Sequence, residues 1–269
     1  LKSLKNYIKE INSIISKIER RLRVYEDAKR DIIKIFKNIY YVGPLRVNFK
    51  RYYTIIVGDL SDIGPEGEDA PYLLYSDFLQ GGGILKRIEK NLQKFELLKT
   101  IKLKNISTEA ELFSIICKEY YSGTQVNIAD MGFGVSQLLP IIIEGFIIPK
   151  NSMILIEQPE IHLHPKSQSN LADLFIEIMN EGKKLLIETH SIYLLNRIQR
   201  RIAEKQISNE DIIIYYITLD NKGSNLKKLE LDENGFLQEI PEGFFDEDFR
   251  ETSMHMDAIL KKINKKKPS

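Results

Sequence analysis

In the stretch Met153-Ile154-Leu155-Ile156-Glu157-Gln158-Pro159-Glu160, four apolar residues run straight into a carboxylate, and a proline and a second carboxylate follow. A helical stretch over about residues 166–180 leads to a second apolar run, Leu185-Leu186-Ile187, and another over about 191–205 leads to a third at 212–217. Short apolar runs that alternate with helices predict a βαβαβ unit. We therefore expect an α/β fold with a parallel sheet that is covered on both faces.

Ligands of such sheets bind beyond the carboxyl ends of the strands, so the residues that follow each apolar run are candidates for chemistry. The first run delivers Glu157 to this edge, as nucleotide hydrolases do with the acid that holds Mg²⁺. The second continues as Glu188-Thr189-His190-Ser191, with a serine suited to cap the next helix. If the two strands are neighbours, Glu157 and His190 converge on one ligand.

A glycine-bearing turn, Asp130-Met131-Gly132-Phe133-Gly134-Val135-Ser136-Gln137, precedes an apolar helical stretch over residues 138–146. Glycines let the backbone approach a phosphate, and the amides and dipole at a helix start favour negative charge. Taken alone, the stretch also fits an ordinary loop-to-helix turn.

The order and spacing of these elements over residues 130–191 resemble those of ABC-type ATPase heads in the SMC/RecF/OLD group. The glycine-bearing turn is similar to the signature, Glu157-Gln158-Pro159-Glu160 to the Walker B end, His162-Leu163-His164 to the D-loop, and Glu188-Thr189-His190-Ser191 to the H-loop. Tyr41-Val42-Gly43-Pro44-Leu45-Arg46 and residues 241–247 also resemble the bacterial AAA-15/AAA-21 ATPases, many of which belong to antiphage systems.

The resemblance implies ATP and Mg²⁺ as cofactors and a role for each motif. Glu157 would hold Mg²⁺ through water, and His190 would contact the γ-phosphate. Four residues of the signature turn are implied to meet the γ-phosphate bound by a second protomer: Gly132, Gly134, Ser136 and Gln137. His164 is implied to lie in a D-loop that crosses the dimer seam.

Gln158 stands where the family carries its general base, a glutamate. A glutamine cannot take a proton near neutral pH, although it can orient a water. General-base assistance contributes roughly 10²–10⁴-fold in rate, so we expect slow hydrolysis unless Glu160 substitutes.

The sequence lacks the Gly-x-x-x-x-Gly-Lys-Ser/Thr loop that cradles the α- and β-phosphates. Its nearest imitation, residues 81–87, has three glycines but not the spacing, and we interpret it as a turn. The resemblance therefore implies the C-terminal half of a head, completed by an N-terminal half that carries the Walker A loop and by a second copy in a homodimer or higher oligomer. The isolated chain is then expected to be inactive as an ATPase.

Residues 1–42 contain neither glycine nor proline and carry apolar residues in a heptad-like pattern that ends with Ile32, Phe36 and Ile39. We expect one long helix, either an antiparallel coiled-coil arm with a partner outside this chain or an amphipathic helix on its own domain. It begins without a cap, as if cut from something longer.

The sequence thus divides into a helical arm (1–42), the C-terminal half of the ATPase domain (43–218) and a small β-meander with a helix over about 246–263 (219–269). Within the second part we expect an extended loop to residue 71, helices on both sides of the glycines at 81–83, and short strands with one helix over residues 100–129.

The composition fits a soluble globular protein, with 39 basic and 38 acidic side chains and a net charge of +1. Such a balance predicts no strong attraction to nucleic acid or membrane. Cys117 is the only cysteine and no secretory leader opens the chain, so we expect a core thiol and a cytoplasmic protein. The most apolar stretch is too short to cross a bilayer.

Two other functions remain open. Glu157, Glu160, His162 and His164 form a possible nuclease metal site, and the heptads with Gln158 fit a non-catalytic interaction module. DNA as a partner follows from the resemblance, with Arg20-Arg21-Leu22-Arg23 and Lys50-Arg51-Tyr52-Tyr53 as possible phosphate contacts. No acidic nuclease cluster of the OLD kind follows residue 191, so an effector nuclease would be a separate protein.

Overall fold

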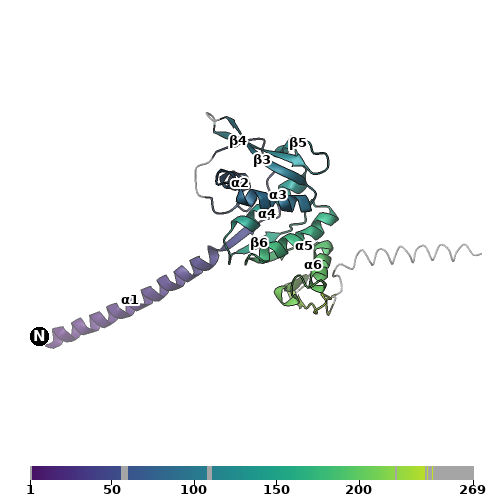
Figure 1. Ribbon diagram of the computed structural model, residues 1–269. Helices are drawn as coiled ribbons and strands as arrows, with labels where there is room; N and C mark the ends of the chain where they lie inside the picture. The colour runs from purple at the N-terminus through teal and green to yellow at the C-terminus, as the bar shows by residue number, and fades with distance from the viewer. Residues whose placement is uncertain are drawn as a thin grey trace, which may run out of the picture. The chain divides into compact units, whose positions relative to one another are not determined.

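The computed structural model describes residues 2–55, 60–107, 111–221, 223–239, 241 and 244, and side chains from residue 15 onward except that of residue 35 (Figure 1). The expected helix over 246–263 lies outside the described residues. The chain divides into two compact units. The first comprises Leu1–Ile161 and Ile178–Thr189, and the second comprises His162–Glu177 and His190–Ser269.

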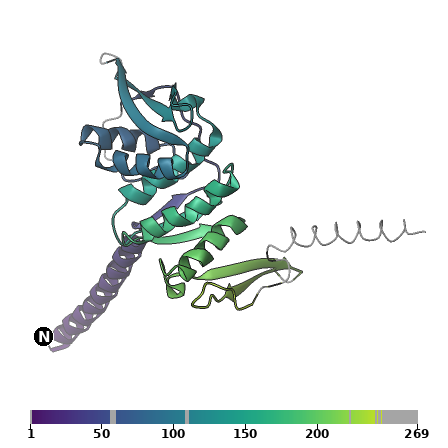
Figure 2. The same ribbon diagram turned by 45° about the vertical axis from the view of Figure 1, so that its right-hand side comes forward.

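The first unit contains the expected parallel sheet, built from β1 (Ile39–Val42), β6 (Met153–Glu157) and β7 (Lys184–Glu188) in the order β1-β6-β7 (Figure 2). Tyr41 pairs with Leu155, and Glu157 pairs with Glu188 at the carboxyl ends. The prediction that β6 and β7 are parallel neighbours is confirmed.

The third strand expected in this sheet, over residues 212–217, is instead part of a hairpin. β8 (Ile214–Asp220) pairs antiparallel with β9 (Gly223–Leu229), and side chains on one face of β8 are exposed, as those of Tyr215 and Ile217 are. Toward the carboxyl end of β8, apolar and polar residues alternate. This alternation is typical of a strand with one face open to solvent, and not of a strand buried on both faces.

β1 belongs to the sheet although its residues were expected to continue the helical arm. The helix α1 (Lys2–Phe36) ends six residues before residue 42, and Ile39-Tyr40-Tyr41-Val42 form a strand. These β-branched and aromatic residues have high strand propensity, and parallel pairing with β6 outweighs the helical periodicity that Ile39 extends by coincidence.

Within the described part of the first unit one face of β7 is open, whereas cover on both faces of the sheet was expected. β7 alternates between exposed and half-buried residues, and Leu186 on its open face is 59% exposed. Among the described residues, neither β1 nor β7 has a partner strand on its outer side.

A four-stranded antiparallel sheet forms the other part of the first unit. It contains β2 (Tyr53–Thr54), β3 (Leu98–Ser107), β4 (Leu112–Glu119) and β5 (Gln125–Asn127) in the order β2-β4-β3, with β5 also on β4. Where a helix was expected within residues 100–129, the described residues (100–107 and 111–129) contain one turn of 3-10 helix, η1 (Ile128–Asp130). Cys117 on β4 is fully buried, as predicted.

Three helices pack in the same unit, α2 (Ala70–Leu79), α3 (Gly83–Lys94) and α4 (Phe133–Ile147). The turn predicted at the three glycines is confirmed: Gly81 and Gly82 have φ angles of 107° and 69°, which glycine adopts without strain. α4 is buried from Val135 to Phe146.

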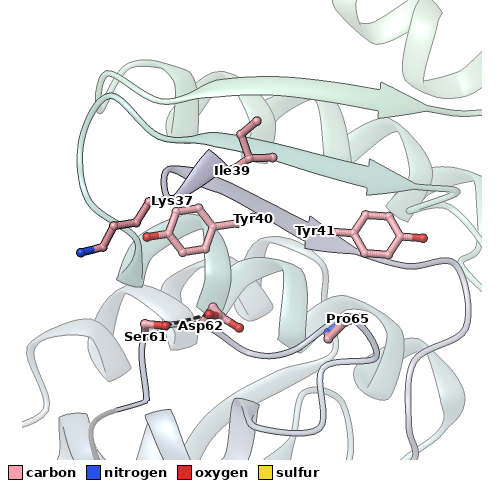
Figure 3. Close-up of a pocket in the computed structure, with 7 residues that line it drawn as sticks. All are labelled: Lys37, Ile39, Tyr40, Tyr41, Ser61, Asp62 and Pro65. Carbon is pink, nitrogen blue, oxygen red and sulfur yellow. Dashed lines mark hydrogen bonds between the residues drawn. The ribbon is translucent and has the colours of Figure 1, made fainter. Parts of the chain in front are cut away.

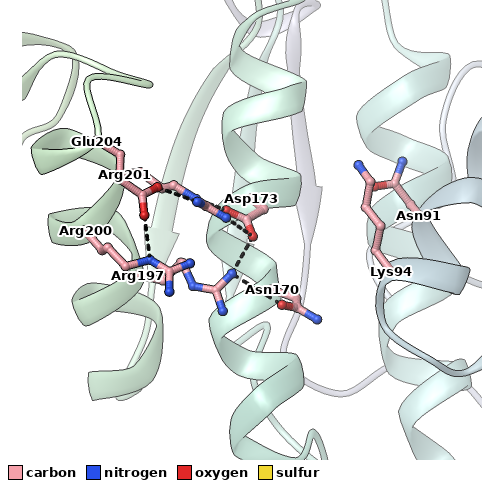
Figure 4. Close-up of polar contacts among 8 residues, drawn as sticks. All are labelled: Asn91, Lys94, Asn170, Asp173, Arg197, Arg200, Arg201 and Glu204. Carbon is pink, nitrogen blue, oxygen red and sulfur yellow. Dashed lines mark hydrogen bonds and ion pairs between the residues drawn. The ribbon is translucent and has the colours of Figure 1, made fainter.

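The second unit contains α5 (Pro165–Met179) through Glu177, α6 (Ile192–Ala203), η2 (Asn209–Asp211) and the β8–β9 hairpin. Asp173 on α5 accepts hydrogen bonds from Arg197 (2.5 Å) and Arg201 (2.6 Å) on α6, as Figure 4 shows. Burial opposes ionisation of Asp173, but the two guanidinium groups outweigh it and lower its pKa. This network sets α6 against α5.

Candidate functional site

Glu157 lies at the carboxyl edge of the parallel sheet, beside two groups that define its environment. The Tyr41 hydroxyl donates a hydrogen bond of 2.9 Å to Glu157 Oε1, and Glu188 is its register partner on β7. The hydrogen bond to Glu157, then burial and the charges of the two glutamates, raise the pKa of Tyr41. A carboxylate has two oxygens, and carboxylate oxygens are ligands that suit a hard cation such as Mg²⁺.

Gln158 turns the chain at the end of β6. Its φ of 44° lies in the left-handed region, which is costly for a residue with a side chain. The Gln158 amide donates to the Glu188 carbonyl at 2.8 Å, and its own carbonyl accepts from the Ile161 amide at 3.3 Å. The sheet's last bond and the following turn therefore hold Gln158 in this conformation.

Glu160 follows two residues later and is 8% exposed. The buried guanidinium of Arg46 is its electrostatic neighbour. Burial lowers the pKa of Arg46 to about 10, against the charge of Glu160, so Arg46 stays charged at neutral pH. The two charges thus lie next to each other inside the first unit.

Arg46 also bonds both candidate motifs of the first unit. Its Nη2 donates to the Glu157 carbonyl at 3.0 Å, and its Nη1 donates to Gln137 Oε1 at 3.1 Å. The Gln137 Nε2 donates back to the Arg46 carbonyl at 3.5 Å.

The glycine-bearing stretch leads into α4, but the helix begins at Phe133, five residues earlier than expected, so the second half of the stretch is helical. Gly132 is the N-cap residue, and no side chain caps the helix. Gly132 and Phe133 are exposed and Gly134 is half-buried, whereas Ser136 and Gln137 are only 4% and 5% exposed. The accessible tip of this motif is therefore Gly132 to Gly134.

A second arginine holds the turn from outside. Arg51 makes a two-pronged ion pair with Asp130, at 2.6 Å and 3.0 Å, and its carbonyl accepts from Asn127 Nδ2 at 2.9 Å. The segment that carries Arg46 and Arg51 thus contacts the turn at two points.

The candidate histidines belong to the second unit. His162, His164 and His190 are all exposed, and His162 has a left-handed φ of 61°. The His164 Nδ1 accepts a hydrogen bond from the Lys166 amide at 3.3 Å.

Gln168 joins the two loops that carry these histidines. Its Nε2 donates to the Leu163 carbonyl at 3.0 Å, and its Oε1 accepts from Ser191 Oγ at 2.6 Å. Ser191 in turn caps α6 by accepting from the Leu194 amide at 3.2 Å, as predicted. The loops that carry His164 and His190 are therefore connected through the hydrogen bonds of Gln168.

A small cavity of about 210 Å³ lies beside β1 in the first unit (Figure 3). It is lined by Lys37, Ile39, Tyr40, Tyr41, Ser61, Asp62 and Pro65.

Glu144 of α4 accepts a hydrogen bond from the Ile63 amide at 3.1 Å, and burial raises its pKa to about 8. Glu144 is 1% exposed.

Sequence reasoning gave no role to Tyr41, Arg46, Glu144 or Gln168. Tyr41 and Arg46 lie in a stretch that carried the resemblance, but their contacts join residues more than 90 positions apart. No local pattern marks such contacts.

Within the part of the chain that the structure describes, no group of three or more His, Cys, Asp or Glu side chains is arranged to hold a metal ion. In the same residues, no helix combines the length and apolar character needed to cross a membrane.

Comparisons with known proteins give two family matches. The family described as AAA ATPase domain matches residues 1–195, and a family described as protein of unknown function (DUF3696) matches residues 207–253. No curated protein matches the chain.

The chain is also similar to solved SMC structures. One comes from work on ATP-driven dimerization and DNA-stimulated activation of SMC ATPases (14% identity, TM-score 0.45, 58% of this chain and 89% of that one). Another is an Smc head domain with a coiled coil and joint from Pyrococcus yayanosii (16% identity, TM-score 0.44, 63% and 30%). A third is an Smc head bound to the C-winged helix domain of ScpA (13% identity, TM-score 0.45, 66% and 53%). The chain thus spans about a third and about half of the last two.

Proposed function

The chain belongs to the AAA ATPase domain family, and we propose that it supplies the Mg²⁺-binding, sensor and signature residues of a composite ATP site. The family-level prediction from the motifs is confirmed by this match. The proposed site is completed by a segment that carries the phosphate-binding loop and by a second copy of the chain. ATP would then close the dimer, and hydrolysis would open it.

The observation that carries the proposal is the setting of Glu157. It ends a central strand of a parallel sheet, at the edge where ligands bind, and Tyr41 orients one of its oxygens. In the proposed site Glu157 holds Mg²⁺ through water, and bound Mg²⁺ supplies charge stabilisation for the phosphates. We propose that His190, two residues beyond β7, contacts the γ-phosphate.

The tip of α4 supports the proposed contact with a second copy. Gly132 and Phe133 at the start of α4 are exposed, and no side chain caps the helix. The dipole of a helix start favours negative charge there. We propose that Gly132 and Gly134 meet the other copy's γ-phosphate, with His164 on the D-loop beside the dimer seam. Ser136 and Gln137 are buried and would support the tip from within.

The sheet itself supports completion by another segment. Its two outer strands have open edges among the described residues, and Leu186 is 59% exposed on β7. Open edges and an exposed apolar face favour pairing with further structure. A segment carrying the phosphate-binding loop would cover both.

We propose slow hydrolysis, because the side chain after Glu157 is an amide. Gln158 can orient a water but cannot remove its proton at neutral pH. Glu160 is a poorer alternative than its spacing implied, since it is buried next to the charge of Arg46.

The exposed stripe of α1 supports a partner helix. Its apolar residues at heptad spacing are about half exposed or more: Ile15, Ile18, Leu22, Tyr25, Ile32 and Phe36. A stripe of this spacing fits a coiled coil with a helix outside the described residues. The antiphage role, DNA and a separate effector nuclease remain proposals that rest on the resemblance.

The test uses the protein together with the phosphate-binding half, and measures Mg²⁺-dependent ATP binding and ATP-dependent dimerisation by light scattering. Glu157→Gln should reduce hydrolysis about 100-fold, because the metal loses its anionic ligand. Glu188→Gln, the register neighbour, is the matched control, because it removes a charge of the same kind, and it should reduce hydrolysis far less than Glu157→Gln. Equal loss in both variants, or none in either, would reject the assignment of Glu157.

The tip is tested by Phe133→Glu, which places a negative charge where the second copy's triphosphate would lie. It should abolish ATP-dependent dimerisation while leaving ATP binding by the single copy intact. Tyr121→Glu, an equally drastic change at a residue that is 77% exposed, should leave dimerisation unchanged. Dimerisation that survives Phe133→Glu would contradict the composite site.

A further inference from the structure

The segment that follows β1 places one buried arginine between two motifs that are distant in sequence. Arg46 lies 91 residues from Gln137 and 111 residues from Glu157, and it bonds both. One bond reaches the first turns of α4, behind the exposed tip, and the other reaches the last carbonyl of β6. The side chain is therefore a direct link between the strand end and the helix start.

The guanidinium suits this link because its donors form a rigid planar fork. Nη1 and Nη2 point to different segments, and Gln137 returns a bond to the Arg46 carbonyl. A lysine offers one point charge on a flexible stem and cannot serve both acceptors in the same geometry. The two segments are thus held at a fixed spacing.

Burial makes the link strong and its loss costly. Arg46 is 6% exposed and Gln137 is 5% exposed, so water cannot readily replace a lost bond. Among the residues that the structure describes, the buried Arg46 Nε has no hydrogen-bond partner. A buried donor left unsatisfied costs free energy.

From these contacts we infer that Arg46 is a positioning residue that couples Glu157 to the tip of α4. Through Arg46, a shift of the strand end that would hold Mg²⁺ moves the helix tip that would meet the second copy's ATP. This inference rests on the proposed function. It makes one copy's metal site and the surface it offers to the other copy parts of a single rigid body.

Arg51 provides a matched control from the same segment. It also bonds the glycine-bearing turn, through Asp130, but it is exposed and the structure gives it no bond to β6. Removing Arg51 loosens one motif, whereas removing Arg46 frees both motifs from each other.

The first experiment needs no nucleotide. Hydrogen exchange is measured by mass spectrometry on wild type, Arg46→Met and Arg51→Met. In Arg46→Met, amides of residues 133–139 and 156–160 should exchange about tenfold faster, because both segments lose a charge-assisted bond. In Arg51→Met, the increase should be confined to residues 127–133. Faster exchange in only one of the two segments of Arg46→Met would overturn the coupling.

The second experiment separates positioning from a merely structural role. In the protein with its phosphate-binding half, Arg46→Lys and Arg46→Met should leave KM for ATP within about twofold and lower kcat about 10–100-fold. Because the two side chains act as a unit, Arg46→Met combined with Gln137→Met should lower kcat no further than Arg46→Met alone. Equal loss in KM and kcat, full activity in Arg46→Lys, or additive losses would overturn the inference.

The two proposals fail in different ways. If wild type neither binds ATP nor dimerises, the proposed function is wrong, and the exchange experiment alone decides whether Arg46 couples the segments. If wild type binds ATP and dimerises while the Arg46 variants keep wild-type kcat, only the inference about Arg46 is wrong.

Discussion

In each unit of the chain, one side chain links a segment to the start of a helix. The two linking side chains differ in kind. In the first unit, Arg46 joins the end of β6 to α4. In the second, Gln168 joins the His162-Leu163-His164 loop to Ser191 at the start of α6. Arg46 is charged and buried, whereas Gln168 is neutral and half-buried.

The span of the two links differs as well. The bonds of Arg46 cross 91 and 111 residues of sequence, while those of Gln168 cross 5 and 23. A link between distant segments forms only once the unit has folded, so it depends on the surrounding packing to hold it. A local link between two loops needs much less of the fold. We therefore expect the first unit to tolerate the loss of its link less well.

The largest effect is expected for Arg46→Met. This change leaves the Glu157 carbonyl and Gln137 Oε1 without a donor and Glu160 without its neighbouring cation. Breaking a buried charged contact costs about 3–5 kcal/mol. Guanidinium denaturation should show a fall of this size in the free energy of unfolding. A fall below 1 kcal/mol would remove the distinction between the two links.

Much of the framework around Arg46 is predictable from the sequence. β6 and β7 are apolar runs that end in glutamate, and α4 is an apolar helix that follows two glycines, so periodicity and turn residues identify all three. β1 escaped because Ile39 continues the heptad spacing of α1, and only pairing with β6 reveals the strand. A strand near β8 was predicted, but it was assigned to the wrong sheet, because an apolar run does not indicate which strand it pairs with.

The candidate site divides along the same line. Motif spacing predicts roles for Glu157, Gln158, His190 and the glycine-bearing turn, and these roles stay predictions. The burial of Ser136 and Gln137 depends on packing that no local pattern encodes. Arg46 and Gln168 act through bonds to other segments, so their roles appear only in three dimensions.

The next largest effect on stability concerns Glu144, a buried ionisable side chain that stays protonated in the folded first unit. Its pKa is raised to about 8 by burial and by the charge of Asp62, against the Ile63 amide bond and the charge of Lys183. The folded state keeps the proton up to about pH 8, whereas the unfolded chain loses it near the ordinary glutamate pKa of 4.5. This contribution to stability is therefore complete below pH 4.5 and is lost as the pH rises to 8.

Glu144→Gln should remove that pH dependence, because the amide oxygen still accepts from Ile63 and no charge can form. At pH 9 the variant should unfold with a free energy about 2–4 kcal/mol higher than wild type, and at pH 4 the two should agree. Denaturation at both pH values tests this. A stability difference that does not change with pH would show that Glu144 is already ionised in the folded unit.

A smaller loss is expected for Gln168→Met, which keeps the volume and removes both bonds of the second unit's link. One lost donor and one lost acceptor in a half-buried setting cost about 1–3 kcal/mol. Because Ser191 still caps α6, hydrogen exchange at the start of α6 should rise less than at residues 163–168. Ser191→Ala is the control that removes the cap as well and should raise exchange at Leu194. A loss as large as that of Arg46→Met would show that charge is not what separates the two links.

The smallest effect is expected for Arg51→Met, although Arg51 makes shorter bonds to the glycine-bearing turn than Arg46 does. Its ion pair with Asp130 is exposed, with 64% and 42% of the two side chains open to solvent. Exposed pairs contribute about 0–1 kcal/mol, and salt screens them. The loss should therefore be below about 1 kcal/mol at low salt and should vanish near 1 M salt, whereas the loss for Arg46→Met should change little. An effect of Arg51→Met that persists at 1 M salt would mean that the geometry of the two-pronged contact matters more than burial, and the contrast drawn between the exposed and the buried arginine would fail.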